Sequence, residues 1–422
     1  MTRTAMPLAA LFVSLAFATA SFAAEPNSSR NAWTDIKPIV DARARYENVD
    51  QDPLVEEANA NTLRLRLGFE TGKVWNTTLL AEGEFVWPFD GDYRDDNSVA
   101  TNTAYPVVPD PESYELNRLQ LTNTSIPGTT VTLGRQRILL DDHRFVGNVG
   151  WRQNEQTFDA VRFVNKSVKS LTLDVTYLNQ VNRVFGPESP QGRYTGDGYL
   201  GNVGFQTPIG KITGFAYVLD FDAIPVSKLP AGMNPIRSST ETYGLRFAGD
   251  RAMGPVKLGY VASYATQEDY GQNPNTFDLD YYVAELTATF KQFTVGLGQE
   301  VLEGNGTVGF ATPLATLHKF NGWTDKFLVT PPAGLDDRYA SLGYAAKGLG
   351  PIETLSATIA YHTYESERGA LDLGDEMNVQ LQAKWKRFLG TLKYADFDAQ
   401  PVAATAAYQD TAKYWVMVDY VW

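Results

Sequence analysis

The stretch Thr62-Leu63-Arg64-Leu65-Arg66-Leu67-Gly68-Phe69-Glu70 decides the fold class. Leu or Phe stands at every second position, and polar residues or Gly stand between them. Side chains of a β-strand alternate between two faces, whereas a helix needs apolar residues three and four positions apart. The stretch therefore predicts a strand with one apolar face and one polar face, and residues 41–47 and 378–386 repeat the pattern.

Segments with strand character follow one another along the whole chain after the N-terminal region. Their lengths of about 9–14 residues suit strands that cross a membrane at a tilt. Eighteen such segments are predicted, at 34–48, 61–72, 75–88, 113–124, 129–140, 155–165, 169–184, 198–207, 211–221, 239–249, 256–268, 279–290, 293–303, 336–347, 352–365, 375–387, 389–398 and 412–422.

The connections between these segments alternate in length. Short turns are expected at 71–73, 125–128, 165–168, 208–210, 291–292, 347–350 and 387–388. Long polar connections are expected at 49–60, 89–112, 141–154, 185–197, 222–238, 304–335 and 399–411. Short periplasmic turns and long extracellular loops are typical of outer-membrane barrels, whereas a soluble sandwich has no reason to sort its loops in this way. The sequence predicts an all-β protein, a single transmembrane antiparallel β-barrel of about 18 strands.

Composition agrees with one exported barrel and excludes several other classes. The 422 residues include no Cys and only three His, which removes disulfides and Cys-ligated metals. The net charge of −13 disfavours a nucleic-acid binder, which needs a basic face. No internal repeat of fixed period appears, which disfavours a propeller or a solenoid.

The N-terminus predicts a cleaved secretory signal at residues 1–23, with the barrel in 24–422. Arg3 precedes a short apolar run, and Ser21-Phe22-Ala23 offers small residues at the positions that signal peptidase reads. Cleavage after Ala23 or Ala24 would remove one base and give a net charge of −14. The expected location is the outer membrane of a Gram-negative cell.

The last strand predicts a partner. Tyr414, Val416, Val418, Tyr420 and the final residue Trp422 share one face. A terminal strand that ends in an aromatic residue is similar to the signal recognised by the barrel-assembly machinery. We therefore expect that machinery and the lipid bilayer as partners, and no nucleic acid.

Basic residues stand at many polar-face positions, which would line the lumen if the apolar face meets lipid. The candidate lumen residues are Arg43, Arg45, Arg64, Arg66, Arg118, Arg162, Arg246, Lys384 and Lys393. Arg135 and Arg137 fall on the same strand face as the apolar Leu133. They can point into the lumen only if a bulge interrupts the alternation or if they lie at the rim of the barrel, so the pattern leaves their direction open. Arginine suits anions because its planar guanidinium binds carboxylates with two hydrogen bonds. Acids also occupy inward positions, so two alternatives stay open: an anion-selective lumen, or Arg–Glu pairs that stiffen the wall.

No enzyme signature appears, so no catalytic residue is expected. None of the three His has a Ser at a suitable spacing, and no G-x-S-x-G motif occurs. We expect no cofactor and no resident metal. A loosely bound Ca²⁺ at the acidic loop near Asp90, Asp92 and Asp95 is an alternative, although the spacing is not that of an EF-hand.

Two stretches, residues 133–161 (LGRQRILLDDHRFVGNVGWRQNEQTFDAV) and 312–327 (TPLATLHKFNGWTDKF), resemble motifs of the alginate-export family of outer-membrane barrels. The resemblance implies an eighteen-stranded channel whose arginine-lined lumen passes a uronate polysaccharide. It adds Arg135, Arg137, Arg144 and Arg152 as conduit or mouth residues, with Arg144 and Arg152 brought back towards the mouth by a compact external turn between two strands. The loop 304–335 becomes the candidate constriction loop, with His318, Trp323, Asp325 and Lys326 as its residues.

Three functions are therefore weighed. The first is passive passage of an anionic polysaccharide or a related sugar acid. The second is a porin for the uptake of small anionic or neutral solutes, to which the acidic external loops and the inward acids point. The third, from another class, is a barrel enzyme that acts on lipid or glycan.

Overall fold

The computed structural model describes residues 35–400 and 408–422, so the expected signal sequence lies outside the described residues. Its strands are β1 (Lys37–Gln51), β2 (Ala58–Glu70), β3 (Thr77–Pro88), β4 (Ser113–Asn123), β5 (Thr129–Gln136), β6 (Thr157–Asn165), β7 (Leu171–Asn182), β8 (Arg193–Thr207), β9 (Gly210–Phe221), β10 (Thr240–Met253), β11 (Val256–Asp269), β12 (Asp278–Phe290), β13 (Phe293–Leu302), β14 (Leu335–Leu349), β15 (Ile352–Glu365), β16 (Asp372–Trp385), β17 (Phe388–Ala399) and β18 (Thr411–Val421). Three 3-10 helices lie in the long connections: η1 (Ala231–Met233), η2 (Pro235–Ser238) and η3 (Leu317–Lys319). Among the described residues, no helix is both long and apolar enough to cross a membrane.

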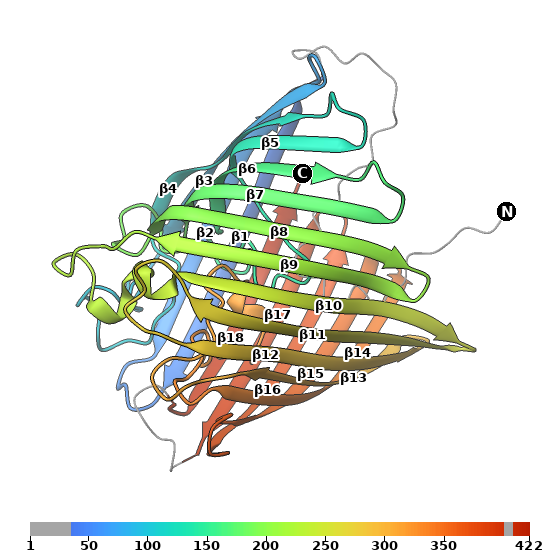
Figure 1. Ribbon diagram of the computed structural model, residues 1–422. Coiled ribbons are helices and arrows are strands. Elements are labelled where there is room, and N and C mark those ends of the chain that lie inside the picture. The colour runs from blue at the N-terminus through green and yellow to red at the C-terminus, as the bar shows by residue number, and fades with distance from the viewer. Residues whose placement is uncertain (1–34, 401–407) are drawn as a thin grey trace.

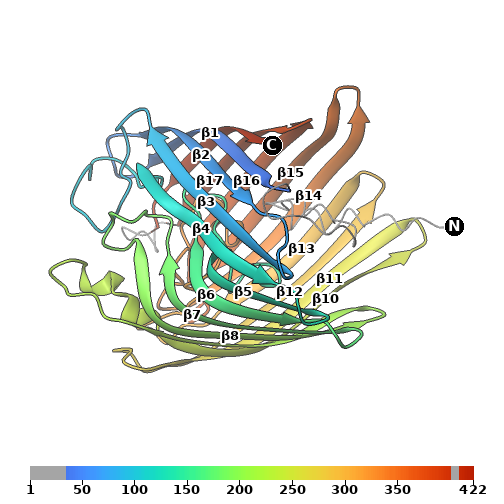
Figure 2. The same ribbon diagram turned by 90° about the horizontal axis from the view of Figure 1, so that it is seen from above.

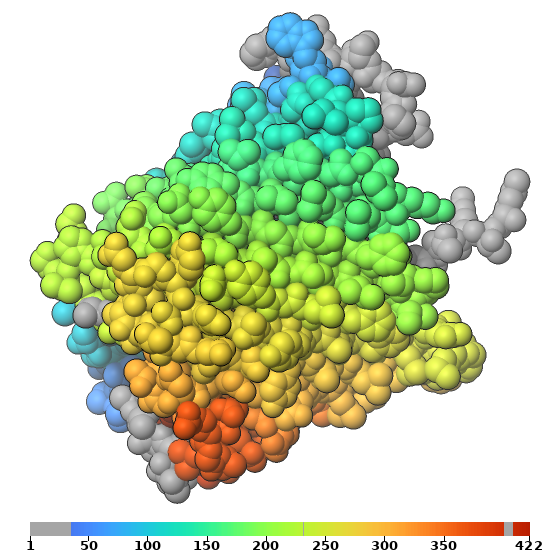
Figure 3. All heavy atoms as spheres, in the orientation of Figure 1, coloured from blue at the N-terminus to red at the C-terminus, as the bar shows by residue number. Residues whose placement is uncertain are grey.

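The strands form one closed antiparallel barrel. Each strand pairs with the next along the chain, and β1 also pairs with β18, from Asp41 opposite Val421 to Gln51 opposite Thr411. Figure 1 shows the strands running side by side in sequence order, and Figure 2 shows them enclosing an interior. In Figure 3 the colour bands follow the same order across the outer surface. The predicted eighteen-stranded barrel is confirmed, because closure pairs the edges of an otherwise open sheet.

The predicted alternation of short and long connections is present from β2 onward, but the first connection, predicted to be long at 49–60, spans only residues 52–57. Only two residues separate β8 from β9, whereas residues 303–334 join β13 to β14. Each predicted segment overlaps one strand, with errors at the ends. Asn165 and Lys347 belong to strands and not to turns, and β8 begins at Arg193 instead of 198.

The two faces of the wall differ as the alternation requires. Outward residues such as Leu245 and Leu297 are 57% and 58% exposed, whereas the inward Arg64 is 1% exposed. The C-terminal strand follows the same rule, since Tyr414, Val416 and Val418 are exposed on the outer face. Many apolar side chains therefore lie on the outside of the barrel. The buried side chains are of two kinds: charged residues such as Arg64, and an apolar cluster that includes Phe215, Phe310 and Phe397.

One part of the wall is irregular, at the short strand β5. The ladder between β4 and β5 runs only from Asn123 opposite Val131 to Leu119 opposite Arg135. Arg135 bridges the edge that follows, because its Nη1 donates to the carbonyl of Leu116 at 3.0 Å while its Nε pairs with Asp159 of β6 at 2.7 Å. The predicted strand 129–140 is therefore too long, because the chain leaves the wall after Gln136. Two residues earlier, Gly134 has a φ of +110°, which interrupts the regular strand conformation.

Candidate functional site: two inserted segments and the charged wall

Two long connections enter the barrel. We call residues 137–156 the first inserted segment and residues 303–334 the second inserted segment. The first touches opposite parts of the wall: the carbonyl of Trp151 accepts hydrogen bonds from Arg43 and Arg45 of β1, and the Phe145 ring lies 4.9 Å from that of Phe215 of β9. The expectation of a compact external turn at 141–154 is therefore wrong, because this connection crosses the interior.

The two inserted segments bind each other through their backbones. The amide of Gly147 donates to the carbonyl of Leu314 at 2.8 Å, and the amide of Thr316 donates to the carbonyl of His143 at 3.0 Å. Gly147 is required at this crossing, because a Cβ there would overlap the hydroxyl of Thr316. The left-handed backbone at Asp141 and His143, with φ of 47° and 72°, turns the first segment sharply.

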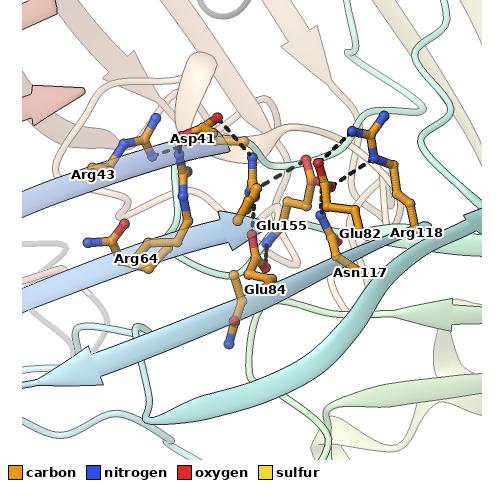
Figure 4. A network of polar contacts seen from close by, with 12 residues as sticks. Asp41, Arg43, Arg64, Glu82, Glu84, Asn117, Arg118 and Glu155 are labelled. Atoms are coloured by element: carbon orange, nitrogen blue, oxygen red, sulfur yellow. Dashed lines mark hydrogen bonds and ion pairs between the residues drawn. The ribbon is translucent and has the colours of Figure 1, made fainter. Parts of the chain in front are cut away.

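The arginines on β1 to β5 and on the first segment are paired with carboxylates, as Figure 4 shows for part of the network. Arg66 pairs with Glu84 and lies 3.7 Å from Glu155 of the first segment. Glu155 also receives Arg137 at 2.5 Å and the amide of Asn117 at 2.6 Å. The positive charges of Arg137, Arg66 and Arg118 hold the pKa of Glu155 well below its usual range, although burial acts in the opposite direction. Glu155 therefore anchors the end of the first segment as a carboxylate.

A second ionic group joins the first segment to β1 and to the second segment. Arg45 pairs with Asp110 of the connection between β3 and β4 at 3.0 Å, and its guanidinium lies 4.4 Å from the centre of the Trp151 ring. Arg152 pairs with Glu47 at 3.0 Å and with Asp325 at 2.9 Å. Arg144 and Arg152 are both buried, so neither lies on an external turn as expected.

A buried lysine holds the second segment against the wall. Nζ of Lys393 on β17 lies 2.7 Å from Nε2 of His318, and 3.7 Å and 4.2 Å from the ring centres of Trp323 and Trp151. Nδ1 of His318 lies 2.7 Å from Asp325. Because a lysine ammonium only donates, this geometry fits a neutral imidazole whose Nδ1 proton points to Asp325. Burial lowers the pKa of His318 well below its usual value, and the charge of Lys393 acts in the same direction, against that of Asp325.

Asp325 is the centre of this group. It accepts from His318, Arg152 and Lys413, the last at 3.1 Å from β18. Burial alone would raise its pKa, but these three partners lower the pKa of Asp325 well below its usual range. One carboxylate thus joins both inserted segments to the last strand.

The opposite wall, from β12 to β16, carries inward acids. They are Glu285, Glu300, Asp337 and Glu376. Arg144 of the first segment pairs with Glu300 at 2.7 Å, and the amide nitrogen of Asn321 donates to Glu300 at 2.7 Å. Glu376 accepts from the backbone amides of Trp323 and Thr324. The second segment is therefore fixed to this wall through its backbone as well.

The remaining predicted residues lie elsewhere in the barrel. Arg162 pairs with Asp174 at 2.5 Å, and Arg246 pairs with Asp142 at 3.1 Å. Lys384 is exposed near a short turn and pairs with Glu353. Every predicted conduit residue except Lys393 thus has a carboxylate within 4 Å.

Sequence reasoning expected acids such as Glu82 and Glu84 at inward positions, but it did not say which base each acid meets. Glu155, Glu300 and Glu376 carried no signal, because nothing in the sequence shows which inward acids meet an inserted loop. Lys413 and Trp415 could have been found, because they alternate with the outward residues of β18. Within residues 35–400 and 408–422, no group of three or more His, Asp or Glu side chains could hold a metal, including the acids around Asp90, Asp92 and Asp95.

Comparison with known proteins gives the fold but no sequence family. No family model matches the chain, and no curated protein sequence matches it. Solved structures of Pseudomonas aeruginosa proteins are similar. They include OpdK with vanillate (TM-score 0.68, 14% identity, 92% of this chain and 98% of that chain), OccK3 (OpdO) (0.67, 14%, 92% and 96%) and OccK8 (OprE) (0.65, 14%, 92% and 98%). Another structure of OpdK is described as an outer membrane protein. At this identity the likeness establishes an eighteen-stranded barrel of the same architecture.

Proposed function

We propose that this protein is a passive channel in the outer membrane, and that it passes small anionic and neutral solutes. Its closed barrel satisfies the backbone groups of the wall without an open edge, as lipid requires. The outward face is apolar, which suits hydrocarbon, and connections of two lengths suit a barrel with a short-turn side in the periplasm. The C-terminal strand that ends in Trp422 remains our proposed recognition site for barrel assembly.

The observation that carries the small-solute proposal is the filling of the interior by the two inserted segments. They contact β1, β9, β13, β16 and β18, and they are joined to the wall by buried ion pairs. Ion pairs in a buried site are costly to break, by about 3–5 kcal/mol when one partner is removed. Such segments leave room for small solutes more readily than for a polymer that must be threaded.

Fewer observations support the proposed preference for anions than support the channel itself. Because the inward arginines are paired, the bulk of their charge is balanced locally. Selectivity must then come from bases near the inserted segments that lack a carboxylate, such as Lys393, whose amine contacts His318 and tryptophan rings. One of the similar structures contains vanillate, a small carboxylate, which supports the same solute class.

Export of a uronate polymer is the less favoured alternative. It rests on the resemblance of residues 133–161 and 312–327 to the alginate-export family. Those two stretches contain the parts of the chain that cross the barrel and bind each other, for example through Gly147 and Leu314. A polymer conduit would need both to move aside.

Conductance across a planar bilayer tests the proposal. We expect the purified barrel to carry a steady current that millimolar benzoate reduces and that uronate oligomers leave unchanged. A current blocked by uronate oligomers and insensitive to benzoate would favour the polymer alternative. Absence of current, together with hydrolysis of lipid or glycan, would refute both channel functions.

A further inference from the structure

Lys326 differs from the other bases of the barrel interior. It is half-buried, and no hydrogen bond, ion pair or ring contact engages its amine. Among residues 35–400 and 408–422, every other Lys or Arg that is not exposed has such a partner. Its amine is therefore free to donate to an anion that reaches it, whereas the other shielded bases are already engaged.

The position of Lys326 is fixed by its two neighbours in the chain. Asp325 is held by Arg152 and Lys413 at 2.9 Å and 3.1 Å. The Phe327 ring packs on that of Tyr364, with ring centres 4.5 Å apart. The backbone at Lys326 is therefore anchored on both sides, so only the lysine side chain would have to be ordered on binding.

The charges around Lys326 place it near the long-connection end of the barrel. Lys413 stands two residues after the start of β18, and Glu376 stands four residues after the start of β16. Asp410 lies in the connection before β18, and Asp325 lies on the same inserted segment. Lys326 therefore lies beside the group centred on Asp325, at the end of the barrel that carries the long connections.

We infer that the amine of Lys326 captures the carboxylate of a small acid at the entrance to the barrel interior. This inference rests on the proposed channel function and names its capture site. The amine would donate a charge-assisted hydrogen bond to the carboxylate. The acids Glu376, Asp325 and Asp410 oppose the anion, which would keep binding weak enough for release.

The ionisation of Lys326 gives the capture site a distinctive pH dependence. Burial, followed by the charge of Lys413, lowers the pKa of Lys326 to about 7, against the opposing charges of Glu376, Asp325 and Asp410. The amine is therefore cationic below this pH and largely neutral above it. Capture of a carboxylate should weaken between pH 6 and pH 8, a range in which benzoate itself stays ionised.

The test measures block of the current by benzoate added from the long-connection side, with benzamide as the uncharged analogue. At pH 6 we expect Lys326→Gln to raise the half-blocking concentration of benzoate about ten-fold, which corresponds to about 1.4 kcal/mol. In the unmodified protein this concentration should rise towards the same value at pH 8. Lys326→Arg should keep the stronger block at both pH values, because its guanidinium does not titrate there.

The matched control is Lys228→Gln, which removes an exposed base from another long connection. It should leave the block by benzoate unchanged, and benzamide should behave alike in all variants. A Lys326→Gln channel that conducts and is blocked as in the unmodified protein at pH 6 would overturn the inference while leaving the channel function intact.

Calorimetric titration of benzoate into the detergent-solubilised full chain separates the two proposals. Binding that depends on Lys326 in a protein without current would support the capture site and refute the channel. Binding that is equal in Lys326→Gln and the unmodified protein would overturn the capture site.

Discussion

Replacing Asp325 by Asn should release the second inserted segment from the wall. The change removes the carboxylate that His318, Arg152 and Lys413 share. Arg152 keeps Glu47 at 3.0 Å, but Lys413 loses its ion pair while remaining buried. Removing one partner of a buried pair costs about 3–5 kcal/mol. The lower figure alone would raise the population of the detached segment about a hundred-fold, since 1.4 kcal/mol is a factor of ten.

Hydrogen exchange read by mass spectrometry measures this population directly. The amides of Lys319 and Phe320 are hydrogen-bonded within η3, and their exchange should accelerate about a hundred-fold when the segment opens. Exchange in the middle of β14 should not change. Single-channel recordings of the same variant should show larger or noisier conductance steps, because the detached segment no longer obstructs the interior.

The control for Asp325→Asn is Glu353→Gln. Glu353 and Lys384 are both exposed and lie 3.4 Å apart, and exposed pairs contribute only about 0–1 kcal/mol. Exchange of the η3 amides should be the same in this variant as in the unmodified protein. If Asp325→Asn also leaves those amides protected, the reasoning is refuted, and the backbone contacts with Glu376 hold the segment without Asp325.

Two further perturbations probe the inserted segments. Gly322→Ala should detach the second segment without any change of charge, because a Cβ at this position would overlap the hydroxyl of Tyr364 and the carboxylate of Glu376. Gly306→Ala is the control. The φ of Gly306 is similar (+92° against +86° for Gly322) but a Cβ there meets open space, so exchange of the η3 amides should be unchanged. A separate prediction concerns His143. Burial, and next the charge of Lys319, lower the pKa of His143 from 6.5 in the unfolded chain to about 4 in the folded protein. As the pH drops, the unfolded chain therefore takes up a proton before the folded protein does, and the free energy of unfolding should fall between about pH 6.5 and about pH 4. The urea midpoint in detergent should therefore fall less from pH 7 to pH 4.5 in His143→Gln than in the unmodified protein, and an equal fall would contradict the assignment.

Sequence alone gives the barrel because its wall depends on local periodicity. Alternation such as that of Leu63 to Phe69 sets the two faces, and the lengths of the connections set which ends of the strands are joined closely. The ends of β5 were harder to place, because Arg135 and Leu133 share parity. The structure resolves this conflict through an irregular backbone at Gly134 and a side chain that bridges β4 and β6.

The interior could not be predicted in the same way, because it depends on contacts between residues far apart in the chain. Nothing local shows that Asp325 meets Arg152, or that Lys393 lies between Trp151 and Trp323. The first inserted segment has the polar composition of an external loop. Its charges are buried only because the wall and the second segment supply matching partners.

The paired interior changes what arginine content implies about selectivity. An arginine such as Arg66, already bound to Glu84, offers a passing anion little net charge, and drawing it away leaves a buried carboxylate. Neither the net charge of −13 nor the number of inward arginines therefore sets the preference for a solute. A base without a carboxylate partner acts differently, because an anion that binds it removes a desolvation cost. Selectivity in such a barrel is consequently a local property of very few side chains, and exchanging a single lysine should alter it more than exchanging any one paired arginine that leaves the fold intact.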